Sequence, residues 1–510
     1  GRGGWLKLGL WPQLPPQKMA SSGGRHLASC MAKLAAAAAL LVATARSEAA
    51  EEHYWPRARG HHGRYFLTEE TLPRNLSSAF AWKFHHPEGR FRTVMRGNPL
   101  IDSKKNVFIS TENGLFKLSS EGEWLWYYTV PTTAHMNIVP CMEGDAIFGM
   151  ARDSTTYSID LETGKERWRV KYAEHVGGDT GYVEAHKGIL ITPVDNSFKH
   201  DGGNLRLLGL NTSTGSKLWE LKLDLPTWNF TPLFPGDGSF IFMDVSGGVY
   251  KVMYRDGKRV WHTKPPAWFE HSFTDGGVSL SPDGSMAFAC SNNHFDTEGA
   301  LRAYRTSDGA RLWDKMLPTG CTSWPVIAKT GDWGVLPAGH FVNKPLILLL
   351  PKWMPGTVQA WLHRFSLYMG PDLRKLPLFN IVIRSVHTEL ISFDTKTGAT
   401  KWSFRTPDWQ RLAAKGDEEG LFERVWAGRS AICLPTTWGT PTMSGDETVY
   451  VGHVSGILYA VKDHDGDGQI DPETEVSTFD MDAAPLPNNP AWAPGMMAVA
   501  SCDTMFVFKS

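Results

Sequence analysis

The chain has 510 residues, of which 42% are hydrophobic and 21% charged, so it can bury a substantial core and is not a disordered protein. Lys and Arg total 52 against 53 Asp and Glu, a balance that gives no general electrostatic reason to bind nucleic acid. Its 50 glycines, 32 prolines and 21 tryptophans are typical of short strands joined by tight turns, and they exclude helical bundles and coiled coils.

Residues 1–50 predict a leader that precedes the fold. Basic residues come before an almost wholly apolar run at 34–45, and small residues follow up to Ala50. This order is typical of a secretory signal peptide, although an Ala-rich transit peptide has a similar composition. A helix of that length covers roughly 18 Å, too little for a bilayer core of about 30 Å. We expect a protein that is secreted or held in the endomembrane lumen, without a membrane span. Met19 and Met31 are both plausible start sites, so the leader can include a gene-model extension.

The rest of the chain is expected to form one domain. Residues 51–78 are interpreted as a linker and residues 79–510 as the folded domain. Two insertions are expected in it, near 338–380 and near 408–430, and the second predicts one or two short helices. Long insertions of this kind often carry function.

The decisive feature of the domain is an internal repeat in which a glycine stands four residues before a tryptophan. The glycine and tryptophan positions are 122/126, 164/168, 215/219, 257/261, 309/313 and 398/402. In each copy an alternating strand ends in polar residues, glycine permits a positive φ at the turn, and the return strand carries the tryptophan. Another hairpin precedes most copies, so each unit of about 42–52 residues holds four short strands, as a β-propeller blade does. We expect each tryptophan to pack between neighbouring blades.

The number of blades follows from the copies. Six tryptophans mark six blades, and residues 448–479 predict a seventh with Phe479 in place of the tryptophan. The hairpin at 496–508 has no outer strand after it, whereas residues 79–84 have the outer-strand pattern. We therefore predict an all-β fold, an eight-bladed β-propeller of four-stranded blades whose last blade pairs strands from both termini and leaves no open edge. Seven blades are the main alternative.

The phrase Asp-x-x-Thr-Gly-x-x-x-Trp, cleanest at residues 160–168 and 394–402, resembles the repeat of pyrroloquinoline quinone-type β-propellers. That family includes eight-bladed alcohol dehydrogenases that depend on calcium and the quinone. It also includes non-enzymatic relatives, such as the propeller lipoprotein that helps to assemble bacterial outer-membrane proteins. The resemblance to the dehydrogenases implies adjacent cysteines beside the quinone, and this sequence has no Cys-Cys pair. The non-enzymatic branch is therefore favoured.

One local motif, residues 463–475, predicts a metal site. Carboxylates at alternate positions can converge on one hard cation, and Gly468 permits the sharp turn that such a loop needs. Thr474 stands where an EF-hand loop has its closing carboxylate, so Glu475 supplies that group if the loop is one residue longer. A solvated acidic turn is the alternative, and a structural calcium ion is favoured over a regulatory one. The expected ligands are Asp463, Asp465, Asp467, Gln469, Asp471 and Glu475.

A weaker pattern concerns five aromatic or imidazole side chains near the start of the innermost strands. They could surround one mouth of the central channel, where propellers usually bind ligands, although packing is the competing interpretation. These candidates are His135, Trp228, His271, Trp324 and Trp438.

Cysteines and glycosylation triplets bear on the compartment. Five cysteines follow the leader, without metal-ligand spacing, so at least one thiol stays free if the others pair. They are Cys141, Cys290, Cys321, Cys433 and Cys502. Possible glycosylation acceptors are Asn75, Asn211 and Asn229.

Two functional hypotheses of different class remain. The first is a secreted or endomembrane propeller that acts as a monomeric binding scaffold, takes a protein or glycan partner on one face, and carries calcium on its late loop. The second is a divergent quinoprotein oxidoreductase that uses pyrroloquinoline quinone and calcium on alcohols or sugars. No catalytic constellation stands out in the sequence, which favours the first hypothesis.

Overall fold

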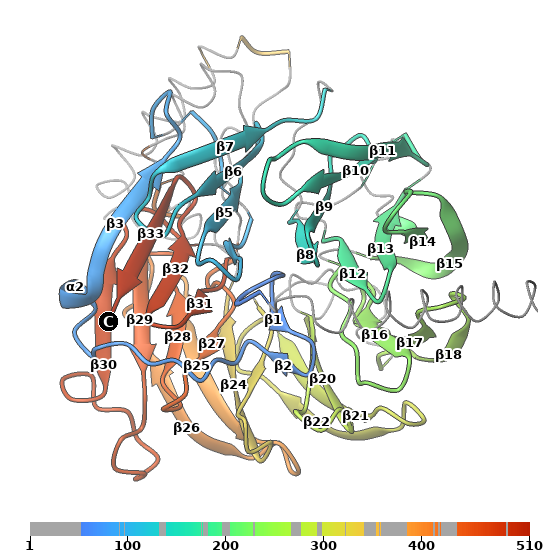
Figure 1. The fold of residues 1–510 in the computed structure, drawn as a ribbon. Coiled ribbons are helices and arrows are strands. Elements are labelled where there is room, and N and C mark those ends of the chain that lie inside the picture. The colour runs from blue at the N-terminus through green and yellow to red at the C-terminus, as the bar shows by residue number, and fades with distance from the viewer. Residues whose placement is uncertain are drawn as a thin grey trace, which may run out of the picture. The chain divides into compact units, whose positions relative to one another are not determined.

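Eight small antiparallel sheets, seven of them from consecutive strands, form the blades of a propeller in the computed structural model (Figure 1). Residues 52–510 make one compact unit. The structure describes residues 53–510 except for 91, 96, 132–138, 175, 177–181, 196–203, 228–229, 267–276, 293–297, 322, 341–352, 356–357, 359–384, 412–413, 417–418, 420–435 and 486–487. The leader therefore lies outside the described residues.

Each blade runs from an innermost to an outermost strand. Blade 1 contains β4 (Leu100–Ile101), β5 (Val107–Ser110), β6 (Leu115–Leu118) and β7 (Trp124–Tyr128). Blade 2 contains β8 (Cys141–Glu143), β9 (Ala146–Met150), β10 (Thr155–Asp160) and β11 (Glu166–Lys171). Blade 3 contains β12 (Glu184–His186), β13 (Ile189–Val194), β14 (Asn204–Asn211) and β15 (Lys217–Thr227). Blade 4 contains β16 (Ser239–Met243), β17 (Val249–Met253) and β18 (Arg259–Thr263), with a bridge from Leu233 to Ile241 on its inner side.

The second half of the ring follows the same plan. Blade 5 contains β19 (Val278–Leu280), β20 (Met286–Asn292), β21 (Gly299–Arg305) and β22 (Arg311–Met316). Blade 6 contains β23 (Val326–Ile327), β24 (Trp333–Gly339), β25 (Thr388–Asp394) and β26 (Thr400–Arg405). Blade 7 contains β27 (Thr442–Met443), β28 (Val449–Gly452), β29 (Ile457–Val461) and β30 (Val476–Asp480). Blade 8 contains β31 (Ala491–Ala493), β32 (Met496–Ala500) and β33 (Thr504–Lys509), and its outer strand is β3 (Phe80–His85).

Blade 8 closes the ring with strands from both ends of the domain. β3 pairs antiparallel with β33, with Trp82 opposite Val507 and Phe84 opposite Met505. Because the inner edge of β3 is satisfied by the chain's own last strand, the ring has no unfinished blade. The prediction of eight blades is confirmed, and the seven-blade alternative is wrong.

The repeated tryptophans pack between blades, as predicted. Each ring lies against the turn glycine of the next blade, and a Cβ on that glycine would come within 2.6–3.0 Å of the ring. These glycines have φ between +67° and +87°, a conformation that side chains other than glycine's rarely adopt. The tryptophan–glycine pairs are 82–122, 126–164, 168–215, 219–257, 261–309 and 313–398. Phe479 takes the same place in blade 7, where its ring stacks on Phe80 of blade 8 at 5.5 Å.

The first expected insertion falls inside blade 6. β24 and β25 are neighbours in the sheet, with Gly339 opposite Thr388, so the residues between them interrupt a hairpin. Most of 338–380, and most of the expected helices at 408–430, lie outside the described residues. In the described part of 408–430, Trp409 forms a β-bridge with Val386. No described helix is long and apolar enough to cross a membrane.

Residues 53–78, interpreted above as a linker, pack onto the propeller instead. They contain a two-stranded hairpin, β1 (Gly60–His61) with β2 (Arg64–Tyr65), and a single helical turn, α2 (Leu76–Ala79). Trp55 is 1% exposed and Leu76 is fully buried, so the stretch buries apolar area that a solvated linker would leave in water.

Candidate functional site

Residues 53–70, which we call the axial segment, lie over the axis of the ring and contact the inner part of every blade (Figure 1). Trp55 exchanges two backbone hydrogen bonds with Ile101 of β4, at 2.9 and 3.0 Å. Leu67 forms a parallel bridge with Met443 of β27, on the other side of the ring. One contact in each of blades 1 to 8 is, in order, Ile101, Met142, Glu184, Thr231, Val278, Lys329, Met443 and Gly495.

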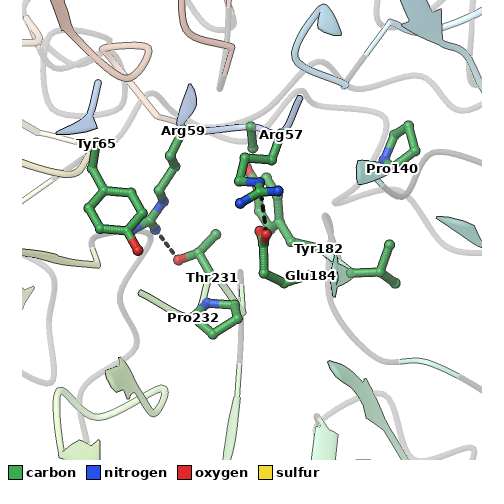
Figure 2. Close-up of a pocket in the computed structure, with 10 residues that line it drawn as sticks. Arg57, Arg59, Tyr65, Pro140, Tyr182, Glu184, Thr231 and Pro232 are labelled. Carbon is green, nitrogen blue, oxygen red and sulfur yellow. Dashed lines mark hydrogen bonds and ion pairs between the residues drawn. The ribbon is translucent and has the colours of Figure 1, made fainter. Parts of the chain in front are cut away.

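Two arginines of the axial segment point into the ring (Figure 2). Arg57 Nε lies 3.0 Å from a carboxylate oxygen of Glu184, and both side chains are nearly buried. Arg59 donates to the backbone carbonyl of Val278 at 2.7 Å and to the hydroxyl of Thr231, and its guanidinium lies 5.0 Å from the ring centre of Trp324. Each arginine therefore links the axial segment to blades far away in the sequence.

Burial shifts the pKa values of the charged groups at the end of the ring that the axial segment covers. Burial raises the pKa of Glu184 to about 7, against the opposing effect of Arg57 and Arg59. Burial also lowers the pKa of Arg59 to about 9, and it holds the pKa of His62 well below its ordinary value. The Arg57–Glu184 pair is thus a buried ion pair, in which loss of either partner leaves an uncompensated charge.

The space among these side chains is small. The cavity lined by Arg57, Arg59, Tyr65 and Glu184 measures about 10 Å³, room for about one water molecule. Pyrroloquinoline quinone is a planar three-ring tricarboxylate, and it does not fit there. We therefore derive no redox step at this end of the ring.

Two of the five residues expected at a channel mouth lie in the described structure, and both are packing residues. Trp324 is 2% exposed and packs on Arg59. Trp438 is fully buried, donates its indole N–H to the carbonyl of Ala338 at 3.2 Å and packs against His453. The other three, His135, Trp228 and His271, lie outside the described residues.

The loop between β29 and β30 gathers carboxylates, as the sequence predicts. Oxygen atoms of Asp463, Asp465 and Glu475 all lie within 4.8 Å of one another, close enough to share one cation. Glu475 is 6% exposed and sits at the base of the loop, so it takes the closing position rather than Thr474. Ile470 packs against the core, which anchors the loop as expected.

The other two expected carboxylates, Asp467 and Asp471, do not join this group. Asp467 accepts the backbone N–H of Gln469, and Asp471 accepts the hydroxyl of Thr474. Backbone N–H groups of Asp471 and His464 bind the Glu475 carboxylate and lower its pKa, so it is ionised and ready to bind a cation at neutral pH. The structure therefore brings together three of the five predicted carboxylate ligands.

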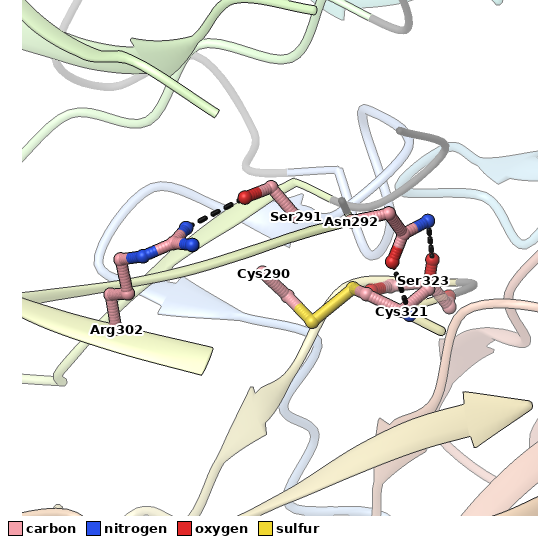
Figure 3. The surroundings of a disulfide bond; sticks show 6 residues. All are labelled: Cys290, Ser291, Asn292, Arg302, Cys321 and Ser323. Carbon is pink, nitrogen blue, oxygen red and sulfur yellow. Dashed lines mark hydrogen bonds between the residues drawn. A yellow bond between two sulfur atoms is a disulfide. The ribbon is translucent and has the colours of Figure 1, made fainter. Parts of the chain in front are cut away.

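A disulfide between Cys290 of β20 and Cys321 joins blade 5 to the segment that leads into blade 6 (Figure 3). Asn292 beside it donates to the carbonyl of Cys321 at 3.0 Å and accepts the backbone N–H of the same residue. Cys141 is free and buried, and Cys502 is disulfide-bonded. The expectation of at least one free thiol is consistent with this pairing.

The axial segment is the feature that sequence reasoning missed. Tyr54, Trp55, Tyr65 and Phe66 lie within a stretch of fewer than twenty residues, a density of aromatic side chains that is unusual for a solvated linker. That density is a signal for burial, but it does not say against what the residues pack.

Comparison with known proteins agrees with this architecture. A family model described as outer membrane protein assembly factor BamB matches residues 79–229 and 152–404. Among solved structures, BamB from Moraxella catarrhalis has 12% identity and a TM-score of 0.54, over 84% of this chain and 99% of that one. The quinohemoprotein alcohol dehydrogenase of Comamonas testosteroni has 10% identity and a TM-score of 0.59, over 91% and 81%. A second such dehydrogenase, ADHIIG from Pseudomonas putida HK5, has 10% identity, a TM-score of 0.57 and the same coverage. The curated proteins contain no sequence match.

At such low identities the solved structures show the fold alone. The family model, in contrast, spans residues 79–404, more than half of the chain, and it covers the blades whose tryptophans and turn glycines carry the repeat. The chain therefore belongs to the PQQ-repeat β-propeller family described as outer membrane protein assembly factor BamB.

Proposed function

We propose that this protein is a secreted or endomembrane-lumen scaffold that binds a protein partner on a propeller face, and that the loop at 463–475 binds a structural calcium ion. The observation that carries the proposal is the axial segment, because it fills one end of the ring with the chain's own side chains. The family match supports a role in interaction, since the family model describes an assembly factor.

Two further observations support the compartment and the metal. The Cys290–Cys321 disulfide suits an oxidising environment such as the secretory pathway. The grouping of Asp463, Asp465 and Glu475 supplies oxygen ligands of the kind that Ca²⁺ prefers, on the loop between the paired strands β29 and β30. Calcium would neutralise these acids and hold the loop against the core.

The test is a titration of the purified chain from residue 50 with pyrroloquinoline quinone, with and without Ca²⁺. Tryptophan fluorescence reports binding, and dye-linked alcohol oxidation reports turnover. We expect calcium-dependent thermal stabilisation with no response to the quinone. Saturable, calcium-dependent quenching with turnover would overturn the proposal and favour a quinoprotein oxidoreductase acting on alcohols or sugars.

A further inference from the structure

The contact that joins blade 6 to blade 7 departs from the contact that joins the other blades. In five blades the docked tryptophan donates its indole N–H to a backbone carbonyl of the next blade's turn, at 2.8–3.1 Å. Trp126 packs on its glycine in the same way, but its buried N–H has no acceptor among the described residues. The donor and acceptor residues of the five bonds are Trp82 and Ser120, Trp168 and Thr212, Trp219 and Tyr254, Trp261 and Thr306, and Trp313 and Thr395.

At Trp402 the loop at 463–475 replaces the turn that would supply the acceptor. Trp402 is 6% exposed, and it makes no indole hydrogen bond within the described part of the chain, where the five bonds above are seen. The loop approaches blade 6 through Gly468, at which a Cβ would lie 3.1 Å from the carbonyl oxygen of Lys401. The exchange of a tight turn for this loop leaves a cavity of about 440 Å³ beside Trp402.

The walls of this cavity combine aromatic and charged groups. Trp333 of β24 is half-buried, and its ring centre lies 6.5 Å from that of Trp402 at an interplanar angle of 60°. The polar lining contains both signs of charge, with one lysine from β26, one directly after β29, and carboxylates from the loop and from the turn after β27. These lining residues are Lys401, Lys462, Glu447, Asp463 and Asp467.

We propose that this cavity binds a neutral oligosaccharide. Its volume lies within the range of roughly 300–1,000 Å³ that is usual for small-ligand sites. Lys462 lies 3.7 Å from Asp446, so if Asp463 serves the cation the remaining charges are Lys401 against Glu447 and Asp467. This mixture does not attract an anion, and it suits hydroxyl groups, which both donate and accept hydrogen bonds. The C–H face of a sugar ring stacks on an aromatic ring such as Trp333, and its hydroxyl groups accept from ammonium and indole N–H groups and donate to carboxylates.

Each group then has a distinct role. Trp333 supplies the stacking surface, and Trp402, which also lines the cavity, supplies an indole N–H donor. Lys401 and Asp467 give the hydroxyl contacts that select one sugar over another. The inference rests on the proposed function only in that calcium would order the loop wall, and it does not depend on the protein partner.

The experiment uses the chain from residue 50 with Ca²⁺ and three named probes, cellotriose, maltotriose and N,N′-diacetylchitobiose, studied by saturation-transfer NMR and calorimetry. We expect at least one probe to bind with a Kd near or below about 1 mM. Trp402→Phe keeps an aromatic ring at this position but removes the N–H, and it should weaken binding about tenfold. Trp333→Ala should weaken it by at least about tenfold through loss of stacking.

Trp313→Phe is the matched control, because Trp313 is also a docked tryptophan but its N–H is bonded to Thr395. This variant should lower the melting temperature and leave sugar affinity unchanged. The inference is overturned if none of the three probes binds, or if binding survives in both Trp402→Phe and Trp333→Ala. Thermal shifts with Ca²⁺ and with EDTA on the same samples separate the two proposals. Calcium stabilisation without sugar binding would contradict the sugar site and leave the calcium site standing. Sugar binding that depends on Trp402, without calcium stabilisation, would support the sugar site and contradict the calcium site.

Discussion

The rim of the propeller and its axis are held together in opposite ways. At the rim, one contact is repeated: a tryptophan of one blade lies on the turn glycine of the next, from Trp82 on Gly122 to Trp313 on Gly398. At the axis, the contacts are made once, by a segment whose partners lie up to several hundred residues away, such as Glu70 and Gly495. The repeated contact is redundant and local, whereas each axial contact is unique.

This difference teaches where a repeat protein can acquire function. A docking contact between neighbouring blades can be lost at one place while the other interfaces continue to hold the ring, since such folds are stabilised mainly by nearest-neighbour contacts. Blade 7 uses that freedom, because its loop at 463–475 replaces the docking turn and carries the grouped carboxylates. The axial segment has no such redundancy, and substitutions there should act through charge and burial.

The largest effect is expected at a rim contact. Trp219 is 8% exposed and donates to the carbonyl of Tyr254, so Trp219→Ala should cost about 3–5 kcal/mol in the free energy of unfolding. Gly257→Ala should also destabilise the protein, because its Cβ would meet the Trp219 ring at 2.6 Å. Gly236→Ala is the control for backbone strain alone, since its φ is also positive and nothing lies within 4 Å. Equal losses for the two glycine variants, measured by urea denaturation, would contradict the docking argument.

At the axis, the buried ion pair gives the next effect. Arg57→Met should cost about 3 kcal/mol, because it leaves the Glu184 carboxylate buried without its partner. The double variant Arg57→Met with Glu184→Gln should recover most of that loss, since no charge then remains to be desolvated. A double-mutant cycle by chemical denaturation measures the coupling. Additive losses would mean that the two side chains act independently.

Calcium should stabilise blade 7, where the loop at 463–475 replaces the docking turn. At a Ca²⁺ concentration about 100 times the Kd, binding adds about 2.7 kcal/mol to the free energy of unfolding. EDTA should remove that gain in the wild type. Asp463→Asn with Glu475→Gln should abolish the response to Ca²⁺, whereas Asp471→Asn should keep it, because Asp471 lies outside the group of three. Differential scanning calorimetry with each variant checks the assignment, and a wild type indifferent to EDTA would rule the site out.

The smallest effect is a pH dependence of stability caused by a buried histidine that directly follows β28 in blade 7. His453 is 1% exposed, and burial lowers its pKa to about 3. The unfolded chain binds a proton on this residue below about pH 6.5 and the folded chain does not, so stability falls as the pH falls. Between pH 7.5 and 5.5 the loss should be about 1 kcal/mol, and it should shrink in His453→Gln. A wild-type slope equal to that of the variant would assign the effect to other groups.

Much of the fold could be predicted because the repeated glycine–tryptophan motif is local in the sequence. A glycine four residues before a tryptophan encodes both the turn and the ring that packs on the next blade, so six copies of one pattern indicate the architecture. The late loop was predictable for the same reason, since residues 463–475 are contiguous. Only the structure showed that Glu475 joins Asp463 and Asp465, and that Asp467 and Asp471 lie outside this group.

The sequence by itself determined the four-stranded blade, because alternating strands and turn glycines act over a few residues. It predicted eight blades and the pairing of the two termini, and the structure decided against seven blades. The tertiary structure alone decided what lies on the axis and what opens beside Trp402. Arg57 meets Glu184, and Arg59 meets Val278, only after the ring has closed and brought distant blades together. The reason is that burial, charge pairing and cavity shape depend on contacts between residues far apart in the chain, which no local pattern records.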